Sequence, residues 1–368
     1  VIGPTYPYKG GISHFNTLLC ENLKKEHSVT LISWKRRFPK LLYPVNQLDR
    51  ESKYIIKTDA LFILDYLNPL TWIKVFIKIK REKPDRIIFH WVTTAMTPIF
   101  LVLFYLIKIF TKTKIILICH NIYPHEKRLF DKFFMKIIFN LADYLLVHSK
   151  SAVREIKKIT SNRNIIHAFL PIFNFFSTNK TQTDIASIKN NLNLRENVIL
   201  FFGIVRKYKG LIYLIKALPE VIKQIDTDLL IVGEFWDNKQ KYIDLIYKLG
   251  IENNIKIIDK YIPNEEVGKY FQKADLIVLP YISGSQSGII QIAYAFNKPV
   301  ITTDVSGYSE AVIDEETGFV VQPKNYEELA QKILKFFKLK DRSKFVRNIE
   351  KEKKKNSWEN YIKLLLHI

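Results

Sequence analysis

Short runs of β-branched residues alternate with longer amphipathic stretches along the whole chain, and this alternation is typical of βα units on a parallel sheet. In the first half it predicts strands at 27–33, 86–92, 114–120, 144–149 and 164–169, and helices at 11–25, 69–82, 97–111, 127–141 and 150–157. The opening residues "VIGP" lie within an apolar run, so we expect a first strand that begins before Val1.

The second half of the chain repeats this alternation of predicted strands and helices. It predicts strands at 198–203, 228–233, 255–258, 275–280, 299–304 and around "GFVVQP", with helices at 210–225, 238–249, 264–272, 287–296 and 325–338. A chain of 368 residues is too long for one ordinary core, so two domains are expected.

The expected architecture is α/β, with two Rossmann-like domains that each hold a doubly wound parallel sheet. The first domain covers 1–175 and the second 197–350, with a linker at 176–196, where the periodicity weakens. The last segment, 351–368, contains an amphipathic helix that we expect to pack back on the first domain. Ligands in such sheets bind outside the carboxyl ends of the strands, so we expect both domains to face a central cleft.

The net charge of the chain is strongly positive and unevenly spread. It is +21 overall; residues 1–175 hold 28 basic against 12 acidic residues, and the remainder holds 29 against 24. This asymmetry favours an anionic partner for the first half, such as phospholipid, nucleic acid or a phosphorylated substrate. A Lys/Ile/Asn-rich composition of the source genome would explain the same numbers.

Cysteine usage and hydropathy bear on the compartment. Cys20 and Cys119 cannot form a disulfide framework and lack metal-site spacing, which favours a reducing cytosol. The most apolar run, 98–110, is shorter than the ~20 residues of a spanning helix and contains Lys108. We therefore expect a cytoplasmic protein, peripheral at most on the inner membrane face.

The segment "FFGIVRKYKG" (201–210) places two cations, Arg206 and Lys209, between a predicted strand and a predicted helix. That is the carboxyl edge of a sheet, where anions bind. A guanidinium grips phosphate oxygens with two nitrogens, and an ammonium adds a compact charge. The segment is either a clamp for a diphosphate or a solvated basic turn.

A second anion-binding candidate is "YISGSQSGII" (281–290), in which a small-residue loop opens a helix near Ser287 and Gly288. Helix amino termini present free N–H groups and the positive end of the helix dipole, which suit phosphate. An ordinary capped loop, with Ser285 or Ser287 as N-cap, fits the same residues.

In the first half, Gly10 and Gly11 precede the first predicted helix. Their spacing does not match G-x-G-x-x-G, so a nicotinamide cofactor is disfavoured. His120 ends a predicted strand, where it could donate a hydrogen bond to a substrate or act as acid or base; a structural histidine is the alternative. His90 and His148 end other strands and are weaker candidates, and no spacing predicts a metal site.

Taken together, these motifs resemble glycosyltransferase family 4, whose members are retaining, nucleotide-sugar-dependent enzymes of the GT-B fold. "GGIS" resembles the family's first glycine pair, "FGIVRKYKGLIYLIKAL" its G-x-x-R-x-x-K-G segment, and "LLIVGE" its next strand. "YIPNEEVGKYFQKADLIVLPY" and "AYAFNKPVITTDVSGYSEAVIDEETGFVV" are similar to its base-binding region and C-terminal signature. The resemblance covers nearly the whole chain.

The resemblance implies a donor site with named contacts. Arg206 and Lys209 would hold the donor diphosphate, and Gly10 and Gly11 would lie close beneath it. The resemblance also assigns the remaining donor contacts: backbone N–H groups at Ser287, Gly288 and Ile289 for phosphate or sugar, the main chain of Ile262 with Tyr261 for the nucleobase, and His120 for the transferred sugar.

One departure from the family pattern concerns two glutamates that usually lie eight residues apart in the last loop. Their positions fall on Gly284 and Ile292, and neither is acidic. We expect Gln286 and Gln291 to replace the missing hydrogen bonds to sugar or ribose.

The resulting functional prediction is transfer of a hexose, with retention, from a UDP- or GDP-linked donor to a hydroxyl of a glycan or lipid-linked glycan in cell-surface polysaccharide synthesis. No Asp-x-Asp motif occurs, so we expect side-chain cations to replace a divalent metal and no further cofactor. A nucleotide-sugar epimerase of the same architecture is the alternative enzyme. A non-enzymatic nucleic-acid binder is a third reading, and we find no aromatic-basic interleaving that favours it.

Overall fold

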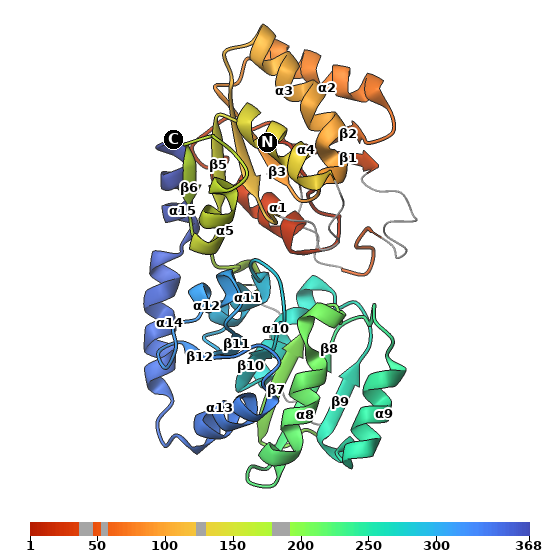
Figure 1. Cartoon of the computed structure of the whole chain (residues 1–368), viewed down its shortest axis with the longest axis vertical. Helices are drawn as coiled ribbons and strands as arrows, with labels where there is room; N and C mark the ends of the chain where they lie inside the picture. Colours follow the sequence, from red (N-terminus) through yellow and green to blue (C-terminus); the bar gives the residue numbers. More distant parts are fainter. Residues whose placement is uncertain (37–46, 53–57, 123–129, 179–191) are drawn as a thin grey trace. The chain divides into compact units, whose positions relative to one another are not determined.

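The computed structural model describes residues 1–36, 47–52, 58–122, 130–178 and 192–368 (Figure 1). The chain forms two compact units. Unit 1 contains Val1–Arg50, Ile55–Phe169 and Trp358–Ile368, and unit 2 contains Glu51–Tyr54 and Leu170–Ser357. The linker predicted at 176–196 lies largely outside the described residues.

Unit 1 is built on a parallel sheet. Its strands are β1 (Ile32–Arg36), β2 (Leu61–Asp65), β3 (Arg86–Trp91), β4 (Lys114–Cys119), β5 (Tyr144–Val147) and β6 (Ile165–His167). Ile2 forms parallel bridges to both Ile32 and Phe89, so the N-terminal segment lies between β1 and β3. The strand predicted for the opening residues is thus reduced to these bridges, and β2 was not predicted.

The helices of unit 1 are α1 (Gly11–Leu23), α2 (Pro69–Glu82), α3 (Thr97–Phe110), α4 (Asp131–Leu141), α5 (Lys150–Lys157) and α15 (Trp358–Leu366), with a 3₁₀ turn η1 (Thr94–Met96). A continuous apolar core joins the sheet to α2, α3 and α4. Phe89 of β3, for example, meets Phe100 and Phe104 of α3, whose rings are one helical turn apart. Burial of such aromatic side chains is the main stabilising term of this layer.

Unit 2 holds a six-stranded parallel sheet in the order β12-β11-β10-β7-β8-β9. Its strands are β7 (Asn197–Phe202), β8 (Thr227–Val232), β9 (Ile255–Ile258), β10 (Leu276–Leu279), β11 (Val300–Thr303) and β12 (Gly318–Val321). Every residue of β8, β10 and β11 is buried, which is typical of a sheet covered by helices on both faces.

The helices of unit 2 are α6 (Phe175–Thr178), α8 (Leu211–Ile222), α9 (Gln240–Leu249), α10 (Asn264–Lys273), α11 (Gly288–Ala295), α12 (Gly307–Ala311), α13 (Tyr326–Lys338) and α14 (Ser343–Lys355), with 3₁₀ turns η2 (Lys207–Lys209) and η3 (Glu252–Asn254). Three of these, α6, α12 and α14, were not predicted. The unpredicted α14 is largely charged and buries only Phe345 and Ile349, one turn apart on its inner face.

The strand order of unit 2 places a topological switch point between β7 and β10 (Figure 1). From β7 the chain moves to β8 and β9 on one side, then returns to β10, β11 and β12 on the other. The loops that leave β7 and β10 therefore diverge at neighbouring carboxyl ends. Ligands of doubly wound sheets bind at this position.

Candidate functional site

The loop after β7 carries Arg206 and Lys209 and has a fixed path. Val205 forms a parallel bridge to Phe235, its N–H donates to Glu234 O at 2.8 Å, and its carbonyl accepts from Trp236 N at 3.0 Å. The loop then turns through η2 into α8. The β7–β8 pairing is thus extended beyond the strands, and it holds the first part of this loop against the segment that follows β8.

Gly210 ends this loop in a conformation that only glycine can adopt there. Its φ is +66°, and a Cβ at this position would lie 1.9 Å from the carbonyl oxygen of Pro280, in the loop after β10. Ile282 N also donates to Tyr208 O at 2.8 Å. The two loops of the switch point are therefore packed and hydrogen-bonded together as one structure.

Lys209 is buried, with 9% of its surface exposed. Its ammonium forms no ion pair within the described part of the chain, and no acidic group contributes to its pKa. Burial first, and the nearby Arg206 charge second, lower the pKa of Lys209 from 10.5 to about 8. A desolvated ammonium beside a guanidinium is costly without an anion, and such an arrangement marks a binding site more often than a structural one.

Arg206 lies over an aromatic ring. Its Cζ is 4.3 Å from the centroid of the Trp236 ring, and its side chain is half-buried. A cation–π contact of this kind orients the guanidinium and leaves its N–H groups available to an oxyanion. The next residue, Lys207, is exposed and belongs to the same turn, so it offers a matched comparison.

The start of α11 lies beside Lys209. A Cβ built on Gly203 would lie 2.9 Å from Lys209 Nζ and 3.7 Å from Ile289 Cδ1, so all three residues meet at one point. Ser287 caps the helix, with its Oγ accepting from Ile289 N at 3.3 Å, while Gly288 N–H has no partner within the described residues. The predicted amide donors at the start of α11 thus lie next to Lys209, one of the two predicted cations.

Neighbouring side chains restrict the space for a side chain at positions 284 and 288, where the sequence has glycine. A Cβ on Gly284 would lie 1.8 Å from Tyr308 Oη, and φ is +140°. This packing leaves no space for the glutamate that the family pattern places at 284. A Cβ on Gly288 would lie 3.0 Å from the ring of Phe173.

The two predicted glutamines, Gln286 and Gln291, differ in how deeply they are buried. Gln291, in the second turn of α11, is buried, and its Oε1 has no hydrogen-bond partner among the described residues. A buried acceptor without a donor is rare in folded proteins, and a ligand hydroxyl would satisfy it. Gln286 lies half-buried in the loop before α11.

Tyr261 and Ile262 lie between β9 and α10, at the same carboxyl edge of the sheet. Ile262 is buried, and neither its N–H nor its carbonyl makes a hydrogen bond within the described residues. Tyr261 beside it is half-buried. A main chain with free donor and acceptor groups is the chemistry needed to read a nucleobase edge.

The other predicted site residues belong to unit 1. Gly10 is the N-cap of α1 with φ +113°, and a Cβ on Gly10 or Gly11 would meet nothing within 4 Å. The amino end of α1 is therefore unobstructed. Gly10 and Gly11 lie in a different unit from Arg206 and Lys209, and the structure describes each unit by itself.

His120 forms a buried row with His90 and His148; the sequence placed all three at strand ends but did not predict that they lie together. Its Nε2 is 2.9 Å from His90 Nδ1, and its ring stacks at 5.8 Å on that of His148, whose Nε2 is 2.9 Å from Tyr361 Oη in α15. The edge of Phe15 in α1 packs against all three imidazoles, at centroid distances of 5.9, 5.2 and 5.6 Å. The repeated endings "IIFH", "LICH" and "LLVH" of three neighbouring strands were the available signal.

Burial sets the protonation of His148 in this row. It lowers the pKa of His148 well below its usual value, with the neighbouring His120 as the next cause. The row also restricts Gly3, because a Cβ there would lie 2.6 Å from His90 Cδ2. Within the described residues, no group of three or more His, Cys, Asp or Glu side chains is arranged to hold a metal ion.

The two parallel sheets place the chain among proteins with the GT-B fold. The Anabaena protein HepE, solved in complex with UDP, superposes with a TM-score of 0.76 at 16% identity, over 100% of this chain and 99% of that one. Residues 182–355 match the model of the family "Glycosyl transferases group 1". The matched segment covers slightly less than half of the chain and is similar to the group 1 glycosyl transferases.

Curated relatives match over part of their length. An uncharacterized glycosyltransferase of Methanocaldococcus jannaschii is 30% identical over 178 residues, 47% of this chain and 44% of that protein. The lipopolysaccharide glucosyltransferase WaaG of Escherichia coli K12 is 28% identical over 151 residues, 40% of this chain and 39% of that protein. The matched regions thus cover less than half the length of each of these relatives.

Proposed function

We propose that the protein is a retaining glycosyltransferase that moves a hexose from a nucleotide diphosphate sugar to a hydroxyl of a glycan or lipid-linked glycan, in cell-surface polysaccharide synthesis. The observation that carries the proposal is the buried Lys209 ammonium beside Arg206 at the switch point of unit 2, without an acidic partner in the described chain. The UDP complex of HepE supports a sugar-nucleotide donor, and the name of WaaG, a lipopolysaccharide glucosyltransferase, supports transfer of a hexose to a cell-surface glycan.

The diphosphate is the group that these cations would bind. When the sugar–phosphate bond breaks, negative charge grows on the leaving diphosphate and positive charge on the anomeric carbon. Arg206, Lys209 and the Gly288 and Ile289 end of α11 would stabilise the growing negative charge. Loss of one such preorganised donor costs about 2.7–4 kcal/mol of barrier, or 10²–10³ in turnover.

No protein base is needed at the acceptor in this proposal. The departing phosphate oxygen can take the proton of the attacking hydroxyl on the same face of the sugar, and this geometry retains the anomeric configuration. Arg206 and Lys209 would supply the charge neutralisation that a divalent metal gives in other phosphoryl-leaving reactions.

The remaining predicted residues would hold the rest of the donor. The free main chain of Ile262, with Tyr261, would read the nucleobase, and Gln291 Oε1 with Gln286 would accept hydrogen bonds from ribose or sugar hydroxyls. In unit 1, His120 would contact the transferred sugar, with its ring fixed by His90. Gly10 and Gly11 would allow α1 to approach the diphosphate.

Thermal-shift measurements with UDP- and GDP-linked hexoses test the donor class, since a ligand at one hundred times its Kd adds about 2.7 kcal/mol of stability. The stabilising donor would then be incubated with glycan acceptors, and the anomeric configuration of the product read by NMR. Arg206→Ala should reduce transfer at least about 100-fold and Lys207→Ala by less than about threefold. Equal small effects, or free epimerised sugar instead of a glycoside, would contradict the proposal.

A further inference from the structure

Exposed apolar side chains are concentrated in one stretch of unit 1. Twelve of the fifteen large apolar residues that are exposed in the described chain lie between Leu61 and Phe134. Scattered single residues of this kind are normal, whereas a contiguous group marks an interaction surface. In addition, no helix within the described residues is long and apolar enough to cross a bilayer.

Helix α2 has two apolar faces. Its inner face buries Val75, Phe76 and Ile79 in the core of unit 1. Its outer face exposes Leu70, Ile73 and Ile77, at 70%, 42% and 59% of their surface, with spacings of three and four residues that align them in one stripe. A surface helix normally has a polar outer face, so this stripe lacks a partner among the residues of unit 1 that the structure describes.

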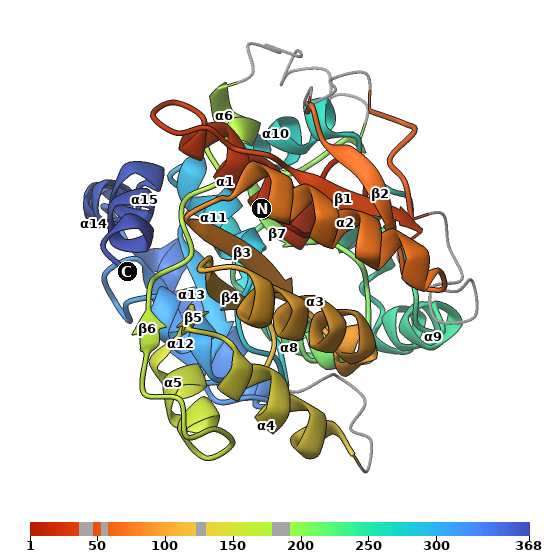
Figure 2. The same cartoon turned by 90° about the horizontal axis from the view of Figure 1, so that it is seen from above.

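Helix α3 extends the same surface. It lies beside α2, as both views show (Figure 2), and the ring of its Phe110 is 5.9 Å from that of Phe76. Ile109 and Phe110 are exposed at its carboxyl end. Lys80 Nζ of α2 lies 5.5 Å from the Phe110 ring, so a cation and an apolar group are adjacent where the helices meet.

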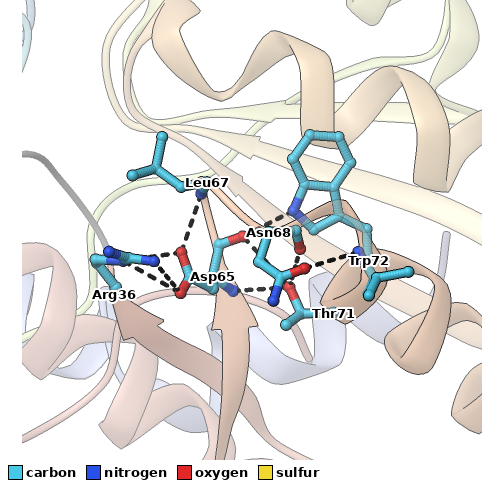
Figure 3. Close-up of polar contacts among 7 residues, drawn as sticks. Arg36, Asp65, Leu67, Asn68, Thr71 and Trp72 are labelled. Atoms are coloured by element: carbon cyan, nitrogen blue, oxygen red, sulfur yellow. Dashed lines mark hydrogen bonds and ion pairs between the residues drawn. The ribbon is translucent and has the colours of Figure 1, made fainter.

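The turn before α2 holds this surface in a fixed conformation (Figure 3). Asp65, at the end of β2, accepts from Arg36 Nε at 3.0 Å, from Arg36 Nη2 at 2.7 Å and from Leu67 N at 3.0 Å. Trp72 Nε1 donates to Asp65 O at 2.8 Å, and Asn68 Oδ1 accepts from Leu70 N at 3.1 Å. The exposed Leu67 and Leu70 thus stand on an ordered turn, which reduces the entropy cost of docking.

The charge of this surface identifies its partner. Helices α2 and α3 carry five basic residues, of which Lys78 pairs with Glu82 and Lys108 with Asp143. The other three, Lys74, Lys80 and Arg81, are exposed and form no ion pair among the described residues. The excess of basic residues across 1–175 opposes pairing with a second copy through this face. An apolar stripe flanked by lysine and arginine is the pattern of a helix that lies in the interface of an anionic bilayer.

We infer that the outer face of α2, with the carboxyl end of α3, docks unit 1 on an anionic lipid surface. The surface is defined by Leu67, Leu70, Ile73, Ile77, Ile109 and Phe110, with Lys74, Lys80 and Arg81 at its side. Delivery of a lipid-linked acceptor by this membrane rests on the proposed function, whereas the docking itself does not.

Flotation with vesicles tests the docking without any sugar donor or acceptor. Vesicles of phosphatidylglycerol and phosphatidylcholine in equal parts should carry the protein, and vesicles of phosphatidylcholine alone should not. The variant Leu70→Gln/Ile73→Gln/Ile77→Gln should lower the bound fraction at least about tenfold, and so should Lys74→Gln/Lys80→Gln/Arg81→Gln. Tyr247→Gln on α9 of unit 2 removes an equally exposed residue, 67% accessible, and should leave binding unchanged.

Two further measurements distinguish a loss of membrane docking from a loss of folding or of nucleotide binding. Circular dichroism and the thermal shift with UDP should be the same for the apolar variant and the wild type, because neither depends on the outer face of α2. Equal flotation of wild type and apolar variant, or no flotation of the wild type on anionic vesicles, would overturn the inference. A dimer in sedimentation that the apolar variant abolishes would also overturn it, by assigning the face to a second copy.

Discussion

The Arg206 guanidinium lies over the indole of Trp236, with Cζ 4.3 Å from the ring centroid. Trp236 is held in place by its main-chain N–H, which donates to the carbonyl of Val205 at 3.0 Å. The contact therefore fixes the conformation of Arg206, one of the two side chains that we propose bind the diphosphate.

Replacement of Trp236 should weaken diphosphate binding without removing a ligand. A partly exposed cation–π contact contributes about 0.5–1 kcal/mol, so Trp236→Leu should raise the Kd for UDP about two- to fivefold, measured by calorimetry. Trp236→Phe keeps an aromatic face and should fall between wild type and Trp236→Leu. A Kd for Trp236→Leu equal to that of the wild type would mean that the indole does not orient Arg206.

Lys209 should make nucleotide binding pH-dependent. Because its pKa is about 8 in the free protein, a bound diphosphate must restore the proton at higher pH. Above pH 8 the Kd for UDP should therefore rise by about tenfold per pH unit, as expected for uptake of one proton. Lys209→Met should bind weakly at every pH and show no such slope; an identical slope in this variant would assign the proton to another group.

The same lysine should lower the stability of the ligand-free chain near neutral pH. Between pH 8 and 10.5 the unfolded chain keeps the proton that the folded chain has lost, so the free energy of unfolding should rise with pH across this window. The pKa difference corresponds to about 3 kcal/mol. At pH 7 Lys209→Met should accordingly unfold at a higher urea concentration than wild type, and a lower midpoint would show that the ammonium has a stabilising partner.

Gly203 and Gly250 offer a matched pair of substitutions. Both have positive φ, +98° and +63°, but a Cβ on Gly203 would lie 2.9 Å from Lys209 Nζ, whereas one on Gly250 meets nothing within 4 Å. Alanine at either position should cost about 1–2 kcal/mol of stability through backbone strain. Only Gly203→Ala should also weaken UDP binding in a thermal-shift titration, and equal weakening by both would exclude a local effect on Lys209.

His148 should make unit 1 sensitive to acid. Since the folded pKa of His148 is well below that of the unfolded chain, the unfolded chain binds the proton first as the pH falls below about 6.5. Stability should therefore decrease from pH 6.5 downward, by about 1.4 kcal/mol per pH unit for this group. Urea titrations of His148→Gln should show a flatter dependence, and an unchanged dependence would exclude His148 as the titrating group.

Helix bounds followed from local signals in the sequence. Pro69 and the Asn68 cap start α2, so the predicted 69–82 agrees with Pro69–Glu82. In contrast, β2 was missed because "LFILD" lacks the alternation of a half-buried strand; its first two residues are exposed. Helix α14 was missed because two buried residues give too weak a period among charged neighbours.

The residue types of the candidate site could be predicted from the sequence, whereas the burial and packing of these residues could not. The strand–loop–helix pattern around "RKYKG" predicted cations at a carboxyl edge, but the burial of Lys209 depends on packing against Gly203 and on the neighbouring loop after β10. The contact between His90 and His120 depends on the register of β3 and β4, which no local pattern encodes.

The central claim is that Arg206 and Lys209 bind a diphosphate, and it is tested most directly by comparing UDP with uridine in calorimetry at pH 7, with GDP and guanosine as the second pair. Wild type should prefer the diphosphate by at least about 100-fold, and Arg206→Ala/Lys209→Met should lose that preference while it keeps its affinity for the nucleoside. A double variant that still prefers the diphosphate as strongly as the wild type would contradict the claim.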